Sequence, residues 1–160
     1  MGNHRMVITP KKRTDAVATE DLQIVQFNAT YQGFGMVMDY VARRMPFAGF
    51  EAGTLTDALH QQLKSGHNLV AVRGNKIVGY AGWLLTSKEI AEAWLADRAK
   101  LVRKQGEEAT AGVLTIVVSD DDAVVPRLIR AVRRLNPGRR AYFKRGADRN
   151  KPVRKRSLQA

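Results

Sequence analysis

Asp120 is the residue whose position first suggests chemistry. It lies just past residues 112–118, an apolar stretch that predicts a buried strand. Ligands commonly enter open α/β sheets at the carboxyl ends of strands, and a carboxylate there can accept a proton. Asp120 is therefore a candidate catalytic residue. Asp121 and Asp122 follow it, but consecutive side chains point in different directions, so we expect helix capping by Asp122 rather than a metal site.

The other residues capable of chemistry give weaker signals. His60 and His67 lie seven residues apart, across a predicted helix end and without a third metal ligand at useful spacing. The chain has no cysteine, which excludes disulfides, thiolate metal sites and cysteine nucleophiles. Gly33-Phe34-Gly35 lies within a helical pattern and follows no strand, so it does not match a phosphate-binding loop. We expect no metal and no bound nucleotide.

The net charge of the chain comes from one segment. Residues 127–156 contain thirteen lysines and arginines and a single acid, Asp148, whereas residues 1–126 are balanced, and the whole chain carries +12. A basic block of this kind attracts a polyanion, an acidic protein or an anionic membrane surface. A solvated tail that only aids solubility is the alternative, and a partner-binding surface is the preferred interpretation.

Part of this basic segment is predicted to form an ordered surface. Residues 124–135 have an apolar stripe at helical spacing, and Arg127, Arg130 and Arg134 fall together on the opposite face. Arginines held by a packed helix suit carboxylate or phosphate ligands. The candidate partner-binding residues are Arg127, Arg130, Arg133, Arg134, Arg139, Arg140, Lys144 and Arg145.

The elements that must position these residues can be predicted from spacing. Residues 68–73 and 76–85 are two apolar runs around Gly74-Asn75, a pattern typical of an antiparallel hairpin. Helices are predicted over residues 20–44, in two pieces that meet at Gly33 and Gly35, and over 55–63 with Thr54 as the cap. Further helices are expected from Ser87 toward Gln105 and over 122–135. Strands are expected at 112–118 and 140–145, and one mixed α/β sheet with helices on its faces accommodates this order.

Composition limits the class of protein. With 160 residues and 44% apolar content, the chain can form one domain with a real core. We expect a mobile basic N-terminal arm over residues 1–18, a single domain over 19–146 and a basic C-terminal tail over 147–160, flexible at 151–156. The first residues carry no apolar run typical of a signal peptide, and no stretch is long and apolar enough to span a membrane. A cytoplasmic protein is the expectation.

Several short motifs follow one another along the chain. They begin with Phe34-Gly35-x-Val37 and the proline turn at Pro46, and they continue through a strand ending at Arg73 and the run Gly79-Tyr80-Ala81-Gly82-Trp83-x-Leu-x-Ser87. The last are Leu135-Asn136-Pro137 and the strand ending at Arg145, followed by Asp148, Lys151, Val153 and Lys155. In this order and spacing the motifs resemble the toxin-activating lysine acyltransferases, small enzymes that acylate RTX hemolysins. The hairpin followed by strand, helix and strand is also the chain order of the GNAT acyltransferase core.

The resemblance implies a GNAT-like, single-domain acyltransferase that takes a fatty acyl group from acyl carrier protein and transfers it to a lysine or another amine of a protein acceptor. No separate cofactor is expected, because the donor is carried on that acidic protein, whereas the acidic loop at residues 119–122 would repel the pyrophosphate of free coenzyme A. The positions that match the family's catalytic histidine and aspartate are Phe47 or Ala48 and residues 114–118, where neither residue occurs. Two alternatives stay open: a catalytically inactive binding or regulatory protein, and a nucleic-acid-binding module in which Tyr142 and Phe143 stack on bases.

Overall fold

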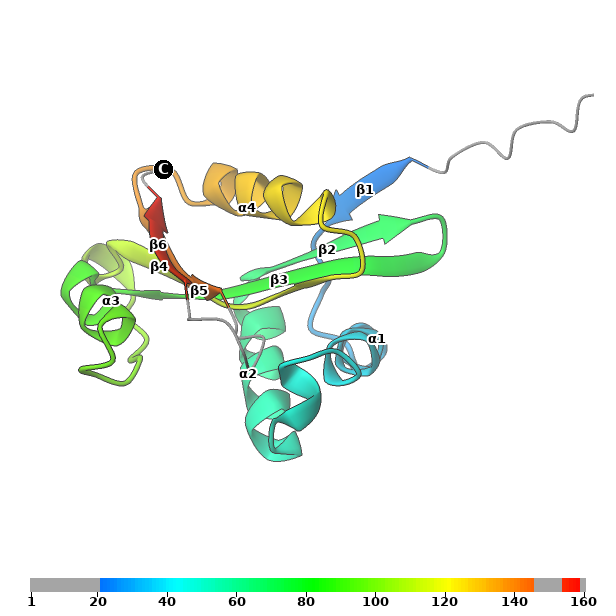
Figure 1. Cartoon of the computed structure of the whole chain (residues 1–160), viewed down its shortest axis with the longest axis horizontal. Coiled ribbons are helices and arrows are strands. Elements are labelled where there is room, and N and C mark those ends of the chain that lie inside the picture. The colour runs from blue at the N-terminus through cyan, green and yellow to red at the C-terminus, as the bar shows by residue number, and fades with distance from the viewer. Residues whose placement is uncertain (1–20, 146–153, 159–160) are drawn as a thin grey trace, which may run out of the picture.

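A computed structural model describes residues 21–145 and 154–158, and its elements form one mixed α/β domain (Figure 1). The predicted fold class is therefore confirmed. In chain order the elements are β1 (Leu22–Val25), α1 (Tyr31–Ala42), η1 (Phe47–Gly49), α2 (Ala52–Ser65), β2 (Asn68–Arg73), β3 (Lys76–Thr86), α3 (Lys88–Leu95), η2 (Gly106–Glu108), β4 (Ala111–Ser119), α4 (Val124–Leu135), β5 (Arg140–Arg145) and β6 (Arg154–Leu158).

The six strands form one sheet in the order β1-β2-β3-β4-β5-β6. Every neighbouring pair is antiparallel except β4 and β5, which are parallel. The predicted hairpin is confirmed as β2 and β3, paired from Arg73↔Lys76 to Asn68↔Gly82. Helix α4 connects the parallel pair, because parallel strands need a crossover.

The helices cover both faces of the sheet. In Figure 1, α4 lies on one face and α1 and α2 lie on the other. Val37, Leu59 and Tyr80 belong to the core beneath α1 and α2, whereas Leu128, Val132 and Ala81 belong to the core beneath α4. Strand β4 is buried from both sides, in agreement with its continuous apolar sequence. Among the described helices, none has the length and apolar character needed to cross a membrane.

The first predicted helix is wrong in its N-terminal half. Residues 22–25 form strand β1, because Leu22 and Ile24 alternate with exposed neighbours and pack against the α4 side of the sheet. Helix α1 begins only after Thr30, whose hydroxyl accepts a hydrogen bond from the Gly33 N–H at 3.0 Å. The glycines therefore lie inside α1 instead of separating two helices.

Other boundaries differ from the predictions at the helix ends. Helix α2 begins three residues before Leu55, and no side chain caps its N-terminus, so Thr54 is not the cap. The residue that follows its last turn, Gly66, is left-handed with φ 70°. Ser87 caps α3 as predicted, but this helix ends at Leu95 and not near Gln105. Part of the C-terminal tail is also ordered, because Arg154–Leu158 pairs with β5 as strand β6. The predicted N-terminal arm lies outside the described residues.

A buried polar network fixes β3 and β4 against α2. The Tyr80 hydroxyl donates to Gln62 Oε1 at 2.8 Å, and Gln62 Nε2 donates to the Thr115 hydroxyl at 2.8 Å. Tyr80 is fully buried, and this burial raises the pKa of its hydroxyl. The Gln62 side chain lies directly over Gly82, where an added Cβ would come within 1.9 Å of its oxygen.

We expect Gly82→Ala to destabilise the protein by several kcal/mol. The new methyl group displaces Gln62, and each buried polar group left without its partner costs about 1–3 kcal/mol. Urea unfolding measures the loss. Gly112→Ala is the matched control, because Gly112 is another buried strand glycine, and its added Cβ would lie 4.0 Å from its nearest neighbour, Leu85 Cδ2. Equal stability of the two variants would contradict the role assigned to Gln62.

Candidate active site

The main cavity of interest lies where β4 and β5 separate. These strands pair from Ala111↔Arg140 to Leu114↔Phe143, and β4 then continues alone to Ser119. A cavity of ≈ 760 Å³ occupies this fork. Its lining comes from the segment around η1, from β4, from α4 and from β5: Pro46, Phe47, Phe50, Leu114, Thr115, Val117, Asp122, Val125, Pro126, Ile129, Phe143 and Lys144.

The lining is suited to a hydrocarbon group. Nine of the twelve lining residues are apolar, and the other three are Thr115, Asp122 and Lys144. Its volume falls within the range of about 300–1,000 Å³ that is typical of small-molecule sites. Phe50, Asp122 and Pro126 are exposed, so the cavity reaches solvent beside them.

Strand β4 contributes polar groups to the otherwise apolar wall. Thr115 is the extra residue of a β-bulge, because Leu114 pairs with Trp83 and Ile116 pairs with Gly82. Such bulges are frequent beside active sites, where they redirect a side chain. The Thr115 hydroxyl accepts from Gln62, which leaves its own proton available for donation.

The backbone of β4 also presents a donor to the fork. The Asp120 N–H donates to Val78 O of β3 at 3.2 Å, so Val118 and Asp120 direct their backbone groups toward β3. Alternate residues of a strand face opposite neighbours, and Val117 therefore directs its N–H toward the side of β5. The pairing with β5 has already ended at Leu114, so none of the described strands pairs with β4 at this N–H.

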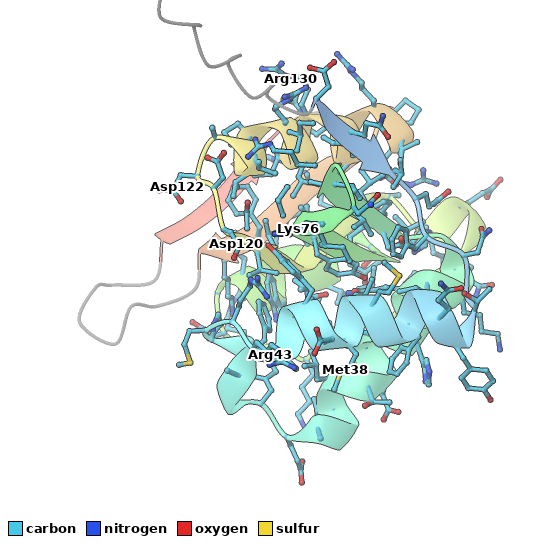
Figure 2. The ribbon with its side chains drawn as sticks, turned by 90° about the vertical axis from the view of Figure 1, so that its right-hand side faces the viewer. Met38, Arg43, Lys76, Asp120, Asp122 and Arg130 are labelled. Carbon is cyan, nitrogen blue, oxygen red and sulfur yellow. The ribbon has the colours of Figure 1, made fainter. Side chains whose placement is uncertain are left out.

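The three aspartates after β4 have three different roles. Asp120 accepts two hydrogen bonds from Arg44, from Nε at 2.6 Å and from Nη2 at 2.8 Å. Asp121 pairs with Arg73 at 3.4 Å and accepts from the Ala123 N–H at 2.9 Å, at the start of α4. Asp122 forms no ion pair or hydrogen bond within the described ranges, and it lines the cavity. Figure 2 shows Asp120 and Asp122 on the loop that leads into α4.

This geometry changes the interpretation of Asp120 and Asp122. Asp120 is absent from the cavity lining, and its hydrogen bonds from Arg44 lower the pKa of its carboxyl, which makes it a poor base. Asp122, predicted as a helix cap, is the carboxylate at the cavity, and α4 has no side-chain cap, because its N-cap residue is Ala123. The structure therefore favours Asp120 as a positioning residue and Asp122 as the candidate catalytic carboxylate.

Arg44 and Tyr40 complete the support around Asp120. The Arg44 guanidinium lies 3.6 Å from the centre of the Tyr40 ring. Burial, together with the nearby Asp120 charge, raises the pKa of the Tyr40 hydroxyl to about 12. Arg44 precedes Pro46 and Phe47 in the chain, so its ion pair joins the η1 wall of the cavity to the end of β4.

We expect Asp120→Asn to weaken the dependence of the free energy of unfolding on pH in the acid range. The pKa of Asp120 is lower in the folded state, so its contribution is complete above the ordinary carboxyl pKa of about 3.9 and disappears as pH falls through the folded value. Because the pair is partly exposed, the contribution at neutral pH is about 1 kcal/mol or less. Urea unfolding of both proteins, at neutral pH and below the carboxyl pKa, measures this difference. If the free energy of unfolding falls by the same amount in both proteins between these two pH values, Asp120 makes no such contribution.

The predicted cationic surface divides into separate parts. Arg127, Arg130 and Arg134 line a second groove on the flank of α4 away from the cavity. Arg130 is labelled on that helix in Figure 2. The other predicted cations lie elsewhere. Arg133 is half-buried, and Arg139 donates to Ala109 O at 2.7 Å. Arg140 lies 5.8 Å from the centre of the Tyr142 ring, whereas Lys144 pairs with Asp97 at 2.6 Å beside the cavity. The Arg145 side chain lies outside the described part.

The aromatic and histidine side chains have packing roles. Tyr142 and Phe143 are buried, at 1% and 6% exposure, so the prediction that they stack on bases is wrong. His60 contacts the Phe34 ring at 3.9 Å and His67 stacks on Trp83 at 5.6 Å. Burial and the nearby Arg103 and Arg139 lower the pKa of His67. No group of three potential metal ligands occurs among the residues described.

Sequence reasoning missed most of the cavity lining. Phe47 and residues 114–118 match catalytic positions of the toxin-activating acyltransferases in the resemblance, and the structure places Phe47, Leu114, Thr115 and Val117 in the cavity. The side chains at these positions are apolar or hydroxylic. The one sequence signal for this wall was the proline turn followed by Phe47 and Phe50.

Solved structures share this architecture. A mosquito arylalkylamine N-acetyltransferase-like protein aligns with 78% of this chain and 76% of its own, at 10% identity and a TM-score of 0.56. An agmatine N-acetyltransferase mutant aligns over 80% and 77%, at 12% identity and a TM-score of 0.57. A GNAT-like decarboxylase in complex with isobutyryl-CoA aligns over 79% and 67%, at 18% identity and a TM-score of 0.53.

These likenesses establish that the chain has the GNAT fold. At such low identity they establish the fold alone. No protein-family model matches the chain, and no curated protein matches its sequence. The function must therefore be argued from the site itself.

Proposed function

We propose that this protein is an N-acyltransferase that moves a fatty acyl group from acyl carrier protein to a lysine or other amine of a protein acceptor in the cytoplasm. The observation that carries the proposal is the apolar cavity at the fork of β4 and β5, with Asp122, Thr115 and the Val117 N–H at its wall. Two of the structural neighbours are named for amine acetylation, and a third holds an acyl-CoA. The apolar lining favours a longer chain than acetyl.

The proposed reaction is an acyl transfer between sulfur and nitrogen. The amine nitrogen attacks the thioester carbonyl carbon, a C–N bond forms, the C–S bond breaks, and a proton released from the attacking nitrogen converts the leaving thiolate to the thiol. The Val117 N–H and the Thr115 hydroxyl are placed to stabilise the oxygen charge that develops on the carbonyl. The acceptor lysine, with an ordinary pKa near 10.4, arrives as an ammonium, and Asp122 attracts this charge and receives the proton.

The loop between β4 and α4 supports a carrier-bound donor over free coenzyme A. In this loop Asp122 is a carboxylate at the cavity rim that pairs with none of the described residues, and Pro126 removes one backbone N–H from the first turn of α4. The carboxylate of Asp122 would repel a pyrophosphate. The N–H that Pro126 lacks is also one of the donors with which a helix N-terminus binds an anion. A pantetheine arm on acyl carrier protein requires no pyrophosphate grip at this position.

The carrier is proposed to dock beside the cavity, on the ribbon of β5 and β6. Lys144 lines the cavity, and the paired positions Lys144↔Lys155 and Arg145↔Arg154 place four basic residues next to each other along this ribbon. An acidic carrier is attracted to such a ribbon. Arg127, Arg130 and Arg134, which were predicted as partner-binding residues, lie across α4 from the cavity, and this position does not favour them as the docking site of the carrier.

The donor proposal is tested by initial rates with palmitoyl-acyl carrier protein and palmitoyl-CoA, using a lysine-containing peptide as acceptor. We expect a higher kcat/KM with the carrier. Reversing Arg154, Lys155 and Arg156 to Glu should raise the carrier KM about tenfold or more, whereas Arg127→Gln, Arg130→Gln and Arg134→Gln together should leave it unchanged. Equal use of palmitoyl-CoA, or an unchanged KM in the reversal variant, would reject carrier docking on the ribbon.

A second candidate is a binding or regulatory protein that has the fold but no reaction. The apolar residues at Phe47 and Ala48 favour it, because no imidazole stands there to accept a proton. Such a protein would bind an acylated carrier and leave the thioester intact. Retention of the thioester with every amine tested, together with measurable carrier binding, would support this second function.

A further inference from the structure

We propose that the groove between α4 and β1 binds an extended acidic segment of a partner protein, which adds to the sheet as a strand beside β1. This inference is independent of acyl transfer and concerns a different part of the molecule. It rests on the shape of the groove, on the positive charge of its rim and on an edge of β1 with which none of the described strands pairs.

The groove has an apolar floor and a cationic rim. Its volume is ≈ 450 Å³, and Leu22, Ile24 and Leu69 of the sheet line it together with Ala131 and Leu135 of α4. Arg127, Arg130 and Arg134 line the same groove from α4. The acyl cavity is lined by Val125, Pro126 and Ile129, on the other flank of the helix, so the two sites are separate.

The three arginines have no compensating charge among the residues that the structure describes. All three are exposed, and none forms an ion pair with a residue in the described parts of the chain. Their spacing of three and four residues places them on one flank, over about 10 Å of helix at a rise of about 1.5 Å per residue. Like charges this close repel one another, and an acidic partner would relieve that repulsion.

The edge of β1 supplies the complementary backbone groups. Leu22–Val25 pairs with β2 through all four residues, and no described strand pairs with its other edge. Proteins commonly protect such edges with lysine, proline or a bulge. The sequence Leu-Gln-Ile-Val contains no charge and no proline, and its pairing with β2 is regular.

These features select a peptide strand over other occupants. Alternate side chains of an added strand would face α4, so a segment with a carboxylate at every second position would meet the arginines. A second copy of this chain would bring two sets of arginines together. Residues 1–20 of this chain are themselves basic. Nucleic acid has phosphates for the rim, but it cannot continue the hydrogen-bond ladder of β1 or use the apolar floor.

The test uses the full chain and a fluorescently labelled peptide of four Glu-Val repeats, followed by fluorescence anisotropy. A second peptide with a proline in its middle has almost the same charge but cannot donate to the ladder at that point. We expect the uninterrupted peptide to bind about tenfold or more tightly than the interrupted one. Amide hydrogen exchange should then show new protection in residues 22–25.

A triple variant tests the rim. Arg127→Gln, Arg130→Gln and Arg134→Gln together should weaken peptide binding about tenfold or more. The matched control is Lys64→Gln, Arg98→Gln and Lys100→Gln, which removes the same charge from other exposed positions and should leave the affinity unchanged. The proposal would be overturned if the two peptides bind equally or if the two triple variants lose the same affinity. Tighter binding of duplex DNA, without protection of residues 22–25, would also overturn it.

Discussion

Asp122→Asn is expected to lower acyl transfer by about 10²-fold or more while leaving the fold unchanged. Asp122 is the carboxylate that lines the cavity and forms no ion pair or hydrogen bond in the described structure, so it is free to attract the acceptor ammonium and to receive its proton. General-base assistance typically contributes about 10²–10⁴-fold to a rate. The amide keeps the size of the side chain but loses both the charge and the ability to accept the proton.

The measurement is kcat for the wild type and the variant, with circular dichroism as the check on folding. Asp121→Asn is the matched control, because Asp121 lies one residue away but accepts a hydrogen bond from the Ala123 N–H and pairs with Arg73. We expect Asp121→Asn to alter stability more than kcat. An Asp122→Asn enzyme with full turnover would show that another group accepts the proton.

Ile129→Phe is expected to shift the acyl-chain preference toward shorter chains. Ile129 lies on the cavity wall in α4, and the larger ring takes space that the end of a long chain would occupy. The loss of room for one methylene in a hydrophobic pocket changes selectivity by about 10–200-fold. We therefore expect kcat/KM for a palmitoyl donor to fall by this factor relative to an octanoyl donor.

Competition between the two donors in one reaction measures this ratio directly. Ile129→Leu nearly conserves the side-chain volume and serves as the control, since such exchanges are usually well tolerated. If Ile129→Phe lowers the rates with both donors equally, the acyl chain does not occupy this cavity. The proposed location of the donor would then be wrong.

Part of the fold could be predicted from the sequence because local signals determine it. The apolar runs around Gly74-Asn75 specify the hairpin, and Ser87 provides a recognisable cap for α3. Strand β1 could not be predicted in the same way. Its four residues also fit a helical stripe, and only pairing with β2 and packing beneath α4 decide between the two.

The site was harder to predict than the fold. A strand bulge at Thr115 and the early separation of β4 from β5 leave no mark in a single sequence, yet they create the cavity. The roles of Asp120 and Asp122 depend on where Arg44 lies, 76 residues away from Asp120 in the chain. Residue types alone could therefore identify the acidic loop but not the carboxylate that lines the cavity.

Intact mass spectrometry of palmitoyl-acyl carrier protein tests the central claim most directly. The carrier is incubated with this protein and a lysine-containing peptide, and both masses are followed with time. The account predicts that the carrier loses the palmitoyl mass and the peptide gains it, at a rate that depends on the peptide and falls in Asp122→Asn. A carrier mass that declines no faster than in buffer, with no acylated peptide, would contradict it.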